Sequence, residues 1–220
     1  MSQSYRRKPT VLAVLNQKGG AGKTTIATNI AHSFVKDHKK TLLVDSDPQG
    51  SARDWNELND SSIVPVVGLD RETIAKDLEA IWTGYDIVII DGAPQIEKMS
   101  IAAVKIADFI LIPVQPSPYD IWACADLVDI IRARQDVTEG KPKAAFVISR
   151  LIRNTKLSQE VYTALEEYKL PILKSTTSQR VIYPTSASEG KTVFCEEESN
   201  LAAQEIISIR DEIMEMIHRA

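Results

Sequence analysis

The sequence predicts an α/β fold, namely a single domain with a doubly wound, mostly parallel sheet flanked by helices. Three observations favour this class. Short apolar runs alternate with helix-like segments, several runs are continuous Val/Ile/Leu stretches, and a glycine-rich turn joins the first run to a helical segment. Uninterrupted apolar strands are typical of parallel sheets, which are buried on both faces. Strands that alternate with helices predict βαβ units.

The composition bounds the class of protein. The 220 residues, 44% hydrophobic and 25% charged, fit one globular domain over residues 1–220, with a flexible N-terminus over 1–9. The net charge of −4 means that any nucleic-acid binding must come from a local basic patch. Cys124 and Cys195 are far apart and have no C-x-x-C spacing, which argues against a disulfide framework or a cysteine metal site. We expect a cytoplasmic protein.

Each predicted element follows from its residue pattern. A helix is expected over residues 70–82, with Asp70 as its N-cap, and another from Asp120 to Arg134. The last 21 residues have an apolar stripe and a mostly acidic polar face. Because anionic lipid repels acidic residues, this segment is expected to pack on the sheet instead of anchoring the chain to a membrane. The predicted strands are Thr10–Asn16, Thr41–Asp47, Ile63–Val67, Asp86–Asp91, Phe109–Val114 and Ala144–Arg150.

A phosphate-binding loop is expected after the first strand, in "VLNQKGGAGKTTIATNIAHSF". The P-loop pattern is G-x-x-x-x-G-K-[ST], and Gln17 stands where its first glycine is expected. Glycines open the backbone so that N–H groups and the following helix N-terminus face an anion. Lys23 is expected to reach the β and γ phosphates, and Thr24 to bind Mg²⁺. The predicted nucleotide-binding residues of the loop are Lys18, Gly19, Gly20, Ala21, Gly22, Lys23, Thr24 and Thr25.

The segment "KGGAGKTT" resembles the deviant Walker A motif of the ParA/MinD family of ATPases, with Lys18 at the position of the family's signature lysine. The resemblance covers most of the chain and is strongest over residues 10–120. It implies that Lys18 crosses a homodimer interface to the ATP phosphates of the partner subunit. A cation from each side would offset phosphate repulsion and stabilise the transition state. We therefore expect Lys18 and Lys23 to be catalytic.

Carboxylates follow two of the predicted strands, in "LLVDSDPQGSARDW" and "YDIVIIDGAP". Ligands of α/β proteins bind at the carboxyl ends of the strands. The resemblance implies that Asp47 lies in switch I and helps to position the attacking water, so it is the third predicted catalytic residue. It also implies that Asp45 supports the metal shell and that Asp91, at the end of a Walker B strand, holds Mg²⁺ through a water. The predicted metal site is therefore Thr24, Asp45 and Asp91.

Two further segments carry predictions near the nucleotide. The proline-rich stretch "PVQPSPYD", residues 113–120, is either a rigid strand-to-helix turn or, as the resemblance to ParF-like small ParA partition proteins implies, part of the dimer contact. Arg150, at the end of the last predicted strand, is expected to lie against adenine.

A DNA-binding surface is predicted between residues 150 and 191. The alternative is an ordinary solvated face, because charge runs usually only solvate. The resemblance implies non-specific DNA binding, with site recognition left to a small centromere-binding adaptor protein. The candidate DNA contacts are Lys156, Lys174, Arg180 and Lys191.

The predicted function is an ATPase that binds Mg²⁺ and ATP, dimerises with ATP, and hydrolyses it slowly under stimulation by a partner. It would bind non-specific DNA of the nucleoid and position cargo, with plasmid or chromosome partition as the leading expectation. One alternative is a metabolic P-loop enzyme that resembles dethiobiotin synthetase. Another is an ATPase that positions a protein complex. No membrane partner is expected.

Overall fold

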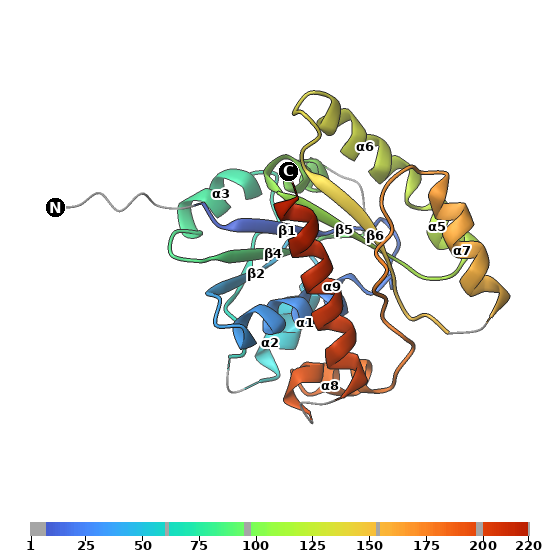
Figure 1. Cartoon of the computed structure of the whole chain (residues 1–220). Helices are drawn as coiled ribbons and strands as arrows, with labels where there is room; N and C mark the ends of the chain where they lie inside the picture. The colour runs from blue at the N-terminus through green and yellow to red at the C-terminus, as the bar shows by residue number, and fades with distance from the viewer. Residues whose placement is uncertain (1–7, 60–61, 95–97, 153–154, 197–199, 220) are drawn as a thin grey trace.

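The computed structural model describes residues 8–59, 62–94, 98–152, 155–196 and 200–219, without the side chains of 98–99 and 156–159. A twisted sheet lies between two layers of helices (Figure 1). The strands are β1 Thr10–Val14, β2 Thr41–Asp45, β3 Val66–Gly68, β4 Ile87–Asp91, β5 Phe109–Val114 and β6 Lys143–Ile148.

The helices connect successive strands and then close the chain. They are α1 Lys23–Lys36, α2 Ser51–Glu57, α3 Ile74–Ile81, α4 Lys98–Ile106, α5 Pro118–Trp122, α6 Ala125–Asp136, α7 Lys156–Glu166, α8 Ile182–Ser188, the 3-10 helix η1 Val193–Cys195 and α9 Leu201–His218.

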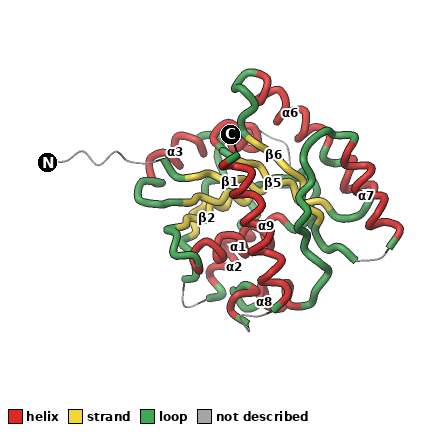
Figure 2. The backbone as a smooth tube through the Cα atoms, in the orientation of Figure 1, coloured by secondary structure: helices red, strands yellow, loops and turns green. Residues whose placement is uncertain are grey.

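The sheet has the order β3-β2-β4-β1-β5-β6, and all pairs among the described residues are parallel. The predicted doubly wound α/β fold is therefore confirmed. Because the strands are parallel, their carboxyl ends meet at one edge of the sheet. Figure 2 shows the strands in the middle of the molecule with helices on both sides. The register pairs Asp91 with Val14 on one side and with Asp45 on the other. The first strand and both predicted carboxylate strands thus end side by side.

Each face of the sheet carries its own hydrophobic core. Alternate residues of each strand point to opposite faces, so Val11 and Ala13 belong to one core and Leu12 and Val14 to the other. Helices α3, α4, α6 and α7 cover the first face, while α1, α2, α8 and α9 cover the second. The predicted packing of the final helix is confirmed, because α9 buries Ala203, Ile206 and similar residues against α1 and β6.

Two helix starts differ from the prediction. Helix α3 begins at Ile74 with Thr73 as its N-cap, so Asp70 is not the cap; the Asp70 carboxylate lies 3.5 Å from Arg53 Nη2. The helix expected from Asp120 is two helices, and the first begins at Pro118, whose fixed φ suits the first helical position. Asp120 is therefore inside α5 and buried.

The strand ends also differ. Strands β1, β2 and β6 each end two residues earlier than predicted, which leaves Asn16, Asp47 and Arg150 in loops, and β3 lies at Val66–Gly68 instead of Ile63–Val67. Of the expected flexible N-terminus, residues 1–7 lie outside the described part, whereas the Lys8 ammonium lies 3.1 Å from Asp108 Oδ1.

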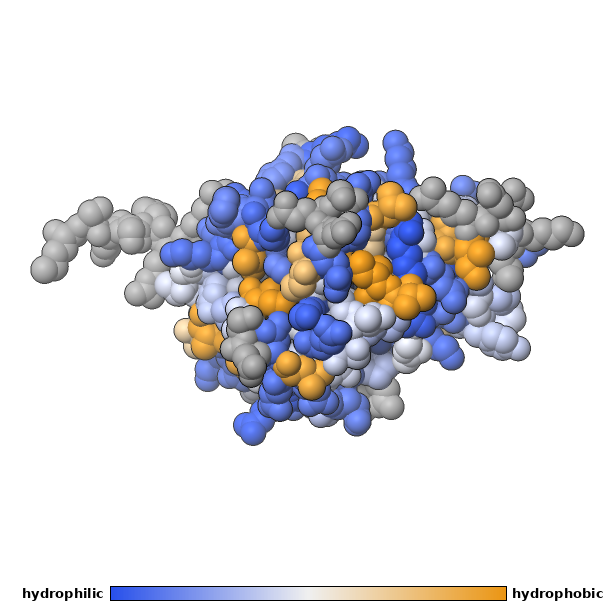
Figure 3. All heavy atoms as spheres, turned by 90° about the horizontal axis from the view of Figure 1, so that it is seen from below, coloured by the Kyte–Doolittle hydropathy of each residue, from blue (hydrophilic) through white to orange (hydrophobic). Residues whose placement is uncertain are grey.

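The surface is mixed in character. The face shown in Figure 3 carries apolar side chains in several separate groups among hydrophilic ones. Within the described ranges, every helix is too short or too polar to cross a bilayer.

Candidate functional site

A glycine-rich loop connects β1 to α1 at the carboxyl edge of the sheet. Gly20 and Gly22 have φ values of 79° and 95°, in the left-handed region that glycine adopts at little cost. Gly22 is the N-cap of α1 and brings no side-chain cap, so the N–H groups of the first turn stay available to a ligand. A helix N-terminus of this kind attracts anions, and phosphates above all.

Three side chains fix the shape of the loop, one at its start and two from other parts of the chain. Asn16 is buried; its Oδ1 accepts from Lys18 N at 2.8 Å and its Nδ2 donates to Pro113 O at 2.6 Å. Gln115 Nε2 donates to Gly20 O at 2.6 Å, and Ser149 Oγ donates to Ala21 O at 2.9 Å. The ends of β1, β5 and β6 therefore hold the loop together. Sequence reasoning missed these residues, whose only signal was their place directly after apolar strands.

Lys23 lies inside the loop. Its side chain is buried, and its Nζ donates to Lys18 O at 3.1 Å. Burial lowers the pKa of Lys23, while the negative charges of Asp91 and Asp47 raise it. The loop thus surrounds a cation that two carboxylates face.

Lys18 differs from Lys23 because its side chain is exposed at the mouth of the loop. Its positive charge acts on Asp120, which is 6% exposed and whose Oδ1 has no hydrogen-bond partner within the described residues. Burial raises the pKa of Asp120, and the positive charges of Lys18 and Arg150 act to lower it. The second lysine is therefore a cation on the outer surface of the site, where another molecule can meet it.

Asp91 has the properties of a metal ligand. It is 1% exposed, it ends β4 between the ends of β1 and β2, and neither carboxylate oxygen has a hydrogen-bond partner in the described part of the chain. Burial raises its pKa to about 7; the charges of Asp45 and Asp47 raise it further, while the Thr24 hydroxyl, which is near the carboxylate but outside hydrogen-bond geometry, and the charge of Lys23 lower it. A buried carboxylate without partners is costly unless a cation or proton compensates it.

Asp45 is buried like Asp91, but both of its oxygens have partners. Oδ1 accepts from Asp47 N at 3.0 Å, and Oδ2 accepts from Ala52 N at 3.1 Å and Arg53 N at 3.0 Å. Asp45 therefore fastens the loop after β2 to the first turn of α2. Asp47 lies in that loop, where its Oδ1 accepts from Gln49 N at 2.9 Å.

Gly92 explains how closely the strands approach at this edge. Its N–H donates to Val14 O at 3.0 Å. A Cβ at this position would lie 2.3 Å from Leu15 Cδ2 and 3.0 Å from Val14 O. Any larger residue would therefore push Asp91 away from the start of the glycine loop.

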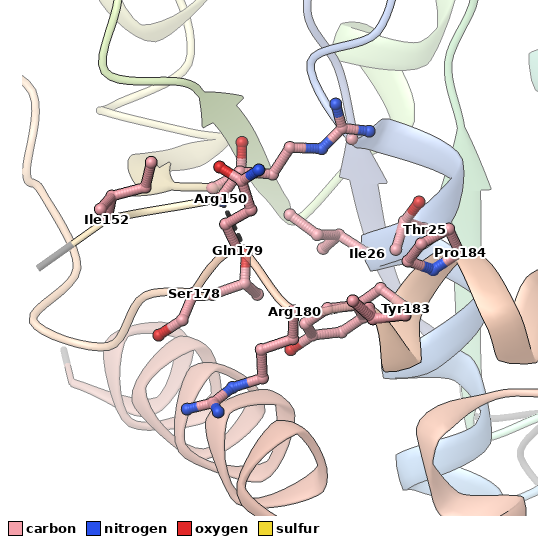
Figure 4. Close-up of a pocket in the computed structure, with 13 residues that line it drawn as sticks. Thr25, Ile26, Arg150, Ile152, Ser178, Gln179, Arg180, Tyr183 and Pro184 are labelled. Carbon is pink, nitrogen blue, oxygen red and sulfur yellow. Dashed lines mark hydrogen bonds between the residues drawn. The ribbon is translucent and has the colours of Figure 1, made fainter.

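A pocket of about 640 Å³ adjoins the loop (Figure 4). One wall comes from Gly22, Thr25 and Ile26 of the loop and α1. The opposite walls come from segments far along the chain, residues 149–152 and 177–184. Arg150, with a left-handed φ of 52°, lines the pocket, so the structure brings the predicted adenine contact next to the loop.

The far wall of this pocket is held by α9. Glu205 accepts from Ser178 N and Oγ, from Arg180 Nε and Nη2 and from Tyr183 Oη, at distances between 2.7 and 3.1 Å. Burial acts to raise the pKa of Glu205, but hydrogen bonds from Arg180, Ser178 and Tyr183 bring it below its ordinary value. Nothing in the sequence pattern singled out Glu205.

The chain after α8 also contacts α2. Trp55 Nε1 donates to Lys191 O at 2.9 Å, and Asn59 Nδ2 donates to Gly190 O at 2.9 Å. Gly190 has a φ of 65°, and a Cβ there would lie 2.8 Å from Asn59 N. The helix that follows Asp47 is thus tied to the chain that leaves α8, beyond the residues that line the pocket.

The predicted DNA contacts do not form one group. Lys174 is exposed and lines a shallow depression together with Arg180, but the Arg180 guanidinium is occupied by Glu205. Lys191 lies near α2 and forms an exposed ion pair with Glu189 at 2.7 Å. The side chain of Lys156 lies outside the described residues.

The comparisons with known proteins agree with this geometry. The family model described as "CobQ/CobB/MinD/ParA nucleotide binding domain" matches residues 12–193. The chain therefore belongs to this family of nucleotide-binding domains, which the loop, the Walker B strand and the fold define.

Two relatives and one structure show how far the similarity extends. The chain is 34% identical over 212 residues to maintenance of carboxysome distribution protein A of Halothiobacillus neapolitanus, covering 94% of this chain and 97% of the relative. It is 25% identical to the chromosome-partitioning ATPase Soj of Thermus thermophilus, covering 98% and 99%. An ATP complex of Cyanothece McdA has a TM-score of 0.75 at 17% identity, covering 94% of this chain and 97% of that one, and so supports the fold.

Proposed function

We propose that the chain is a Mg²⁺-dependent ATPase whose nucleotide-bound form is a homodimer and which positions a large cargo. The observation that carries the proposal is the pairing of two features at one sheet edge. A phosphate loop holds one lysine inside and presents a second lysine outside, and the buried Asp91 carboxylate beside it has no partner among the described residues. A phosphate–metal complex supplies the cation that Asp91 requires.

The side chains near the glycine loop are of the kinds that bind Mg²⁺, and each can be given a role. Thr24, at the start of α1, and Asp91 would hold the ion, directly or through water, and the bound ion would neutralise phosphate charge. Asp45 supports the metal shell from behind, because its oxygens hold the backbone that carries Asp47. Asp47 orients the attacking water, and Lys23 and the loop N–H groups bind the β and γ phosphates.

Dimerisation follows from the outer surface of the loop. Lys18 would reach the triphosphate held by a second copy and offset its charge. Next to it, α5 exposes Tyr119 and Trp122 at 71% and 66%, and their rings form an edge-to-face pair with centroids 5.6 Å apart. Exposed aromatic pairs are typical of interface anchors. We therefore assign the accessible residues of the stretch 115–122 to the dimer contact; Pro113 and Val114 are buried in β5.

The names of the relatives suggest which kind of cargo the proposed ATPase positions. The relative at 34% identity is named for carboxysome distribution and the relative at 25% for chromosome partition. The larger identity favours a protein assembly over a plasmid or chromosome region. In both cases the ATP dimer would be carried by non-specific DNA of the nucleoid in the cytoplasm, and a small adaptor protein would link it to the cargo and stimulate hydrolysis.

The decisive experiment compares Lys18→Ala with Lys39→Ala, an exposed lysine beyond the far end of α1. With Mg²⁺ and ATP, light scattering should show a dimer for the wild type and for Lys39→Ala, and a monomer for Lys18→Ala. Nucleotide binding should persist in all three. A Lys18→Ala protein that dimerises and hydrolyses ATP normally would contradict the proposal. Turnover that requires an added small-molecule substrate would favour a metabolic enzyme instead.

DNA binding is tested best at Lys174. Arg180→Glu would place two carboxylates together, since Glu205 already occupies that position, and would disturb the pocket wall. Lys174→Glu changes an exposed charge only. It should weaken binding of random-sequence DNA by the ATP form about 3- to 10-fold at low salt. Equal affinity across a salt series would remove Lys174 from the DNA surface.

A further inference from the structure

The acidic face of α9 holds the segment from Lys174 to Tyr183 at two places. Glu205 binds Ser178, Arg180 and Tyr183, as described above. Glu212, two helical turns further on, accepts from Lys174 N at 2.9 Å and from Ser175 N at 3.0 Å. A helix on the second face of the sheet therefore fixes a long segment that has no regular secondary structure before α8.

The two glutamates differ in what their partners touch. All three partners of Glu205 line the 640 Å³ pocket beside the phosphate loop, whereas Lys174 and Ser175 do not line it. Figure 4 shows the Arg180 head group turned away from Thr25 and Ile26. Its guanidinium therefore binds Glu205 of α9 and does not point into the pocket. Only 9% of the Glu205 side chain is exposed, against 29% for Arg180.

Glu205 fixes the side of this wall that faces α9, while backbone hydrogen bonds of Thr177 and Gln179 with Ile148 and Leu151 hold its other side. One carboxylate accepts five hydrogen bonds from three residues, which are spaced along the segment and into the first turn of α8. A carboxylate with several fixed donors is a strong local constraint. Loss of the acceptor would leave the Ser178 amide and the Arg180 charge without their partner, which costs far more than the net value of a surface ion pair.

We propose that Glu205 is a positioning residue for nucleotide binding. It acts on the nucleoside half of the ligand, because its partners form the wall that faces the base and ribose, and it leaves the phosphate half unchanged. This inference rests on the proposed function, since it takes the pocket to be the site of the nucleoside. It also assigns Arg180 to the nucleotide site, in place of the DNA surface predicted for it.

The test measures affinity for Mg²⁺-ATP and for Mg²⁺-tripolyphosphate, which lacks the nucleoside, by calorimetry. Glu205→Ala should bind ATP about 10-fold more weakly and tripolyphosphate with wild-type affinity. Glu205→Gln keeps acceptor oxygens and should recover part of the loss. Glu212→Ala is the matched control, because it removes the same kind of contact from the same helix, and its ATP affinity should stay within about twofold of wild type.

A double-mutant cycle sharpens the result. Arg180→Met removes the guanidinium but keeps the aliphatic stem. If Arg180 acts through Glu205, the double variant should lose no more ATP affinity than Glu205→Ala alone. Hydrogen exchange at Ser178 should rise in Glu205→Ala and stay unchanged in Glu212→Ala, which also shows that both variants are folded.

The outcomes separate the two proposals. If the wild type binds ATP but Glu205→Ala binds it equally well, the positioning role is wrong and the proposed function stands. A parallel loss of ATP and tripolyphosphate affinity in a folded Glu205→Ala protein would likewise overturn it, because the effect would then be general. If the wild type binds neither ligand, the proposed function fails and this inference fails with it.

Discussion

The phosphate half of the proposed nucleotide site, around the glycine loop and Asp91, and its nucleoside half, the adjoining pocket, are built in opposite ways. In the phosphate half, short consecutive segments end at one sheet edge, and the central carboxylate, Asp91, has no partner among the described residues. In the nucleoside half, segments far apart in sequence meet, and the central carboxylate, Glu205, accepts five hydrogen bonds. A buried carboxylate without hydrogen-bond partners is suited to bind a cation, whereas a carboxylate whose oxygens both accept hydrogen bonds has a structural role.

Asp45 shows that position alone does not decide between these roles. It pairs in register with Asp91 and is equally buried, but three backbone N–H groups occupy its oxygens. The chemistry of a carboxylate at a strand end therefore depends on the loop that follows it. Substitutions in the two halves should accordingly affect different properties, and the following predictions run from the largest expected effect to the smallest.

Asp91→Asn should reduce Mg²⁺-dependent turnover about 100-fold or more. The variant loses a proposed ligand of the metal ion, and such an ion contributes several kcal/mol to reactions of this kind. The substitution should also stabilise the protein without ligand. The pKa of Asp91 is raised from 3.8 to about 7 in the folded chain, so wild-type stability falls as the pH rises from about 4 to 7 and stays lower above pH 7. Asparagine avoids this loss, on the order of 2–4 kcal/mol at pH 8. Turnover assays and thermal melts would measure both effects, and a destabilised variant would contradict the second.

Asp47→Ala should reduce hydrolysis about 10- to 100-fold and leave ATP binding and dimerisation intact. The reason is that Asp47 is proposed to orient the attacking water, while its neighbour Asp45 holds the loop. Single-turnover kinetics on the ATP dimer would measure the step directly. Wild-type turnover would exclude Asp47 as the residue that positions the water.

Arg150→Asn should weaken ATP binding about 10-fold, because an exposed charged donor is lost from the pocket wall. Asparagine tolerates the left-handed backbone at this position, where φ is 52°. Lys169→Asn is the matched control, since Lys169 is also exposed and has a φ of 47° but is not among the residues that line the pocket. Calorimetry should separate the two variants, and equal affinities would place Arg150 outside the site.

His32→Gln should flatten the dependence of stability on pH. His32, in α1, contacts Thr192 Oγ1 through Nδ1 at 2.5 Å; burial, aided by Lys36, lowers its pKa from 6.5 to about 4. The unfolded chain therefore binds more protons in this window, and wild-type stability falls as the pH drops from 6.5 to 4. After allowance for solvent screening, the effect is about 1–2 kcal/mol. Melts at pH 7.5 and 5 would measure it, with His218→Gln, an exposed histidine, expected to behave as wild type.

The same contrast explains what could be predicted from the sequence. The phosphate half depends on local order, so strand, glycine loop, Lys23, Asp91 and the sheet class followed from pattern and spacing. The nucleoside half depends on contacts such as Glu205 with Arg180, 25 residues apart, which no periodicity encodes. For this reason Arg180 was predicted to contact DNA, and Asn16, Gln115 and Ser149 were missed. The helix starts at Ile74 and Pro118 differed because loop contacts and proline geometry, not apolar spacing, determine where those helices begin.

The tie between α2 and the chain after α8 has a mechanical consequence. The Trp55 indole and the Asn59 side-chain amide donate hydrogen bonds to the carbonyl oxygens of Lys191 and Gly190. The backbone at Gly190 is packed closely against Leu58 and Asn59. A shift of the Asp47 loop would therefore be transmitted through α2 to the chain that follows α8. In the proposed ATPase, a change at the carboxylates after β2 would thus be coupled mechanically to the segment that leads from the pocket wall towards α9.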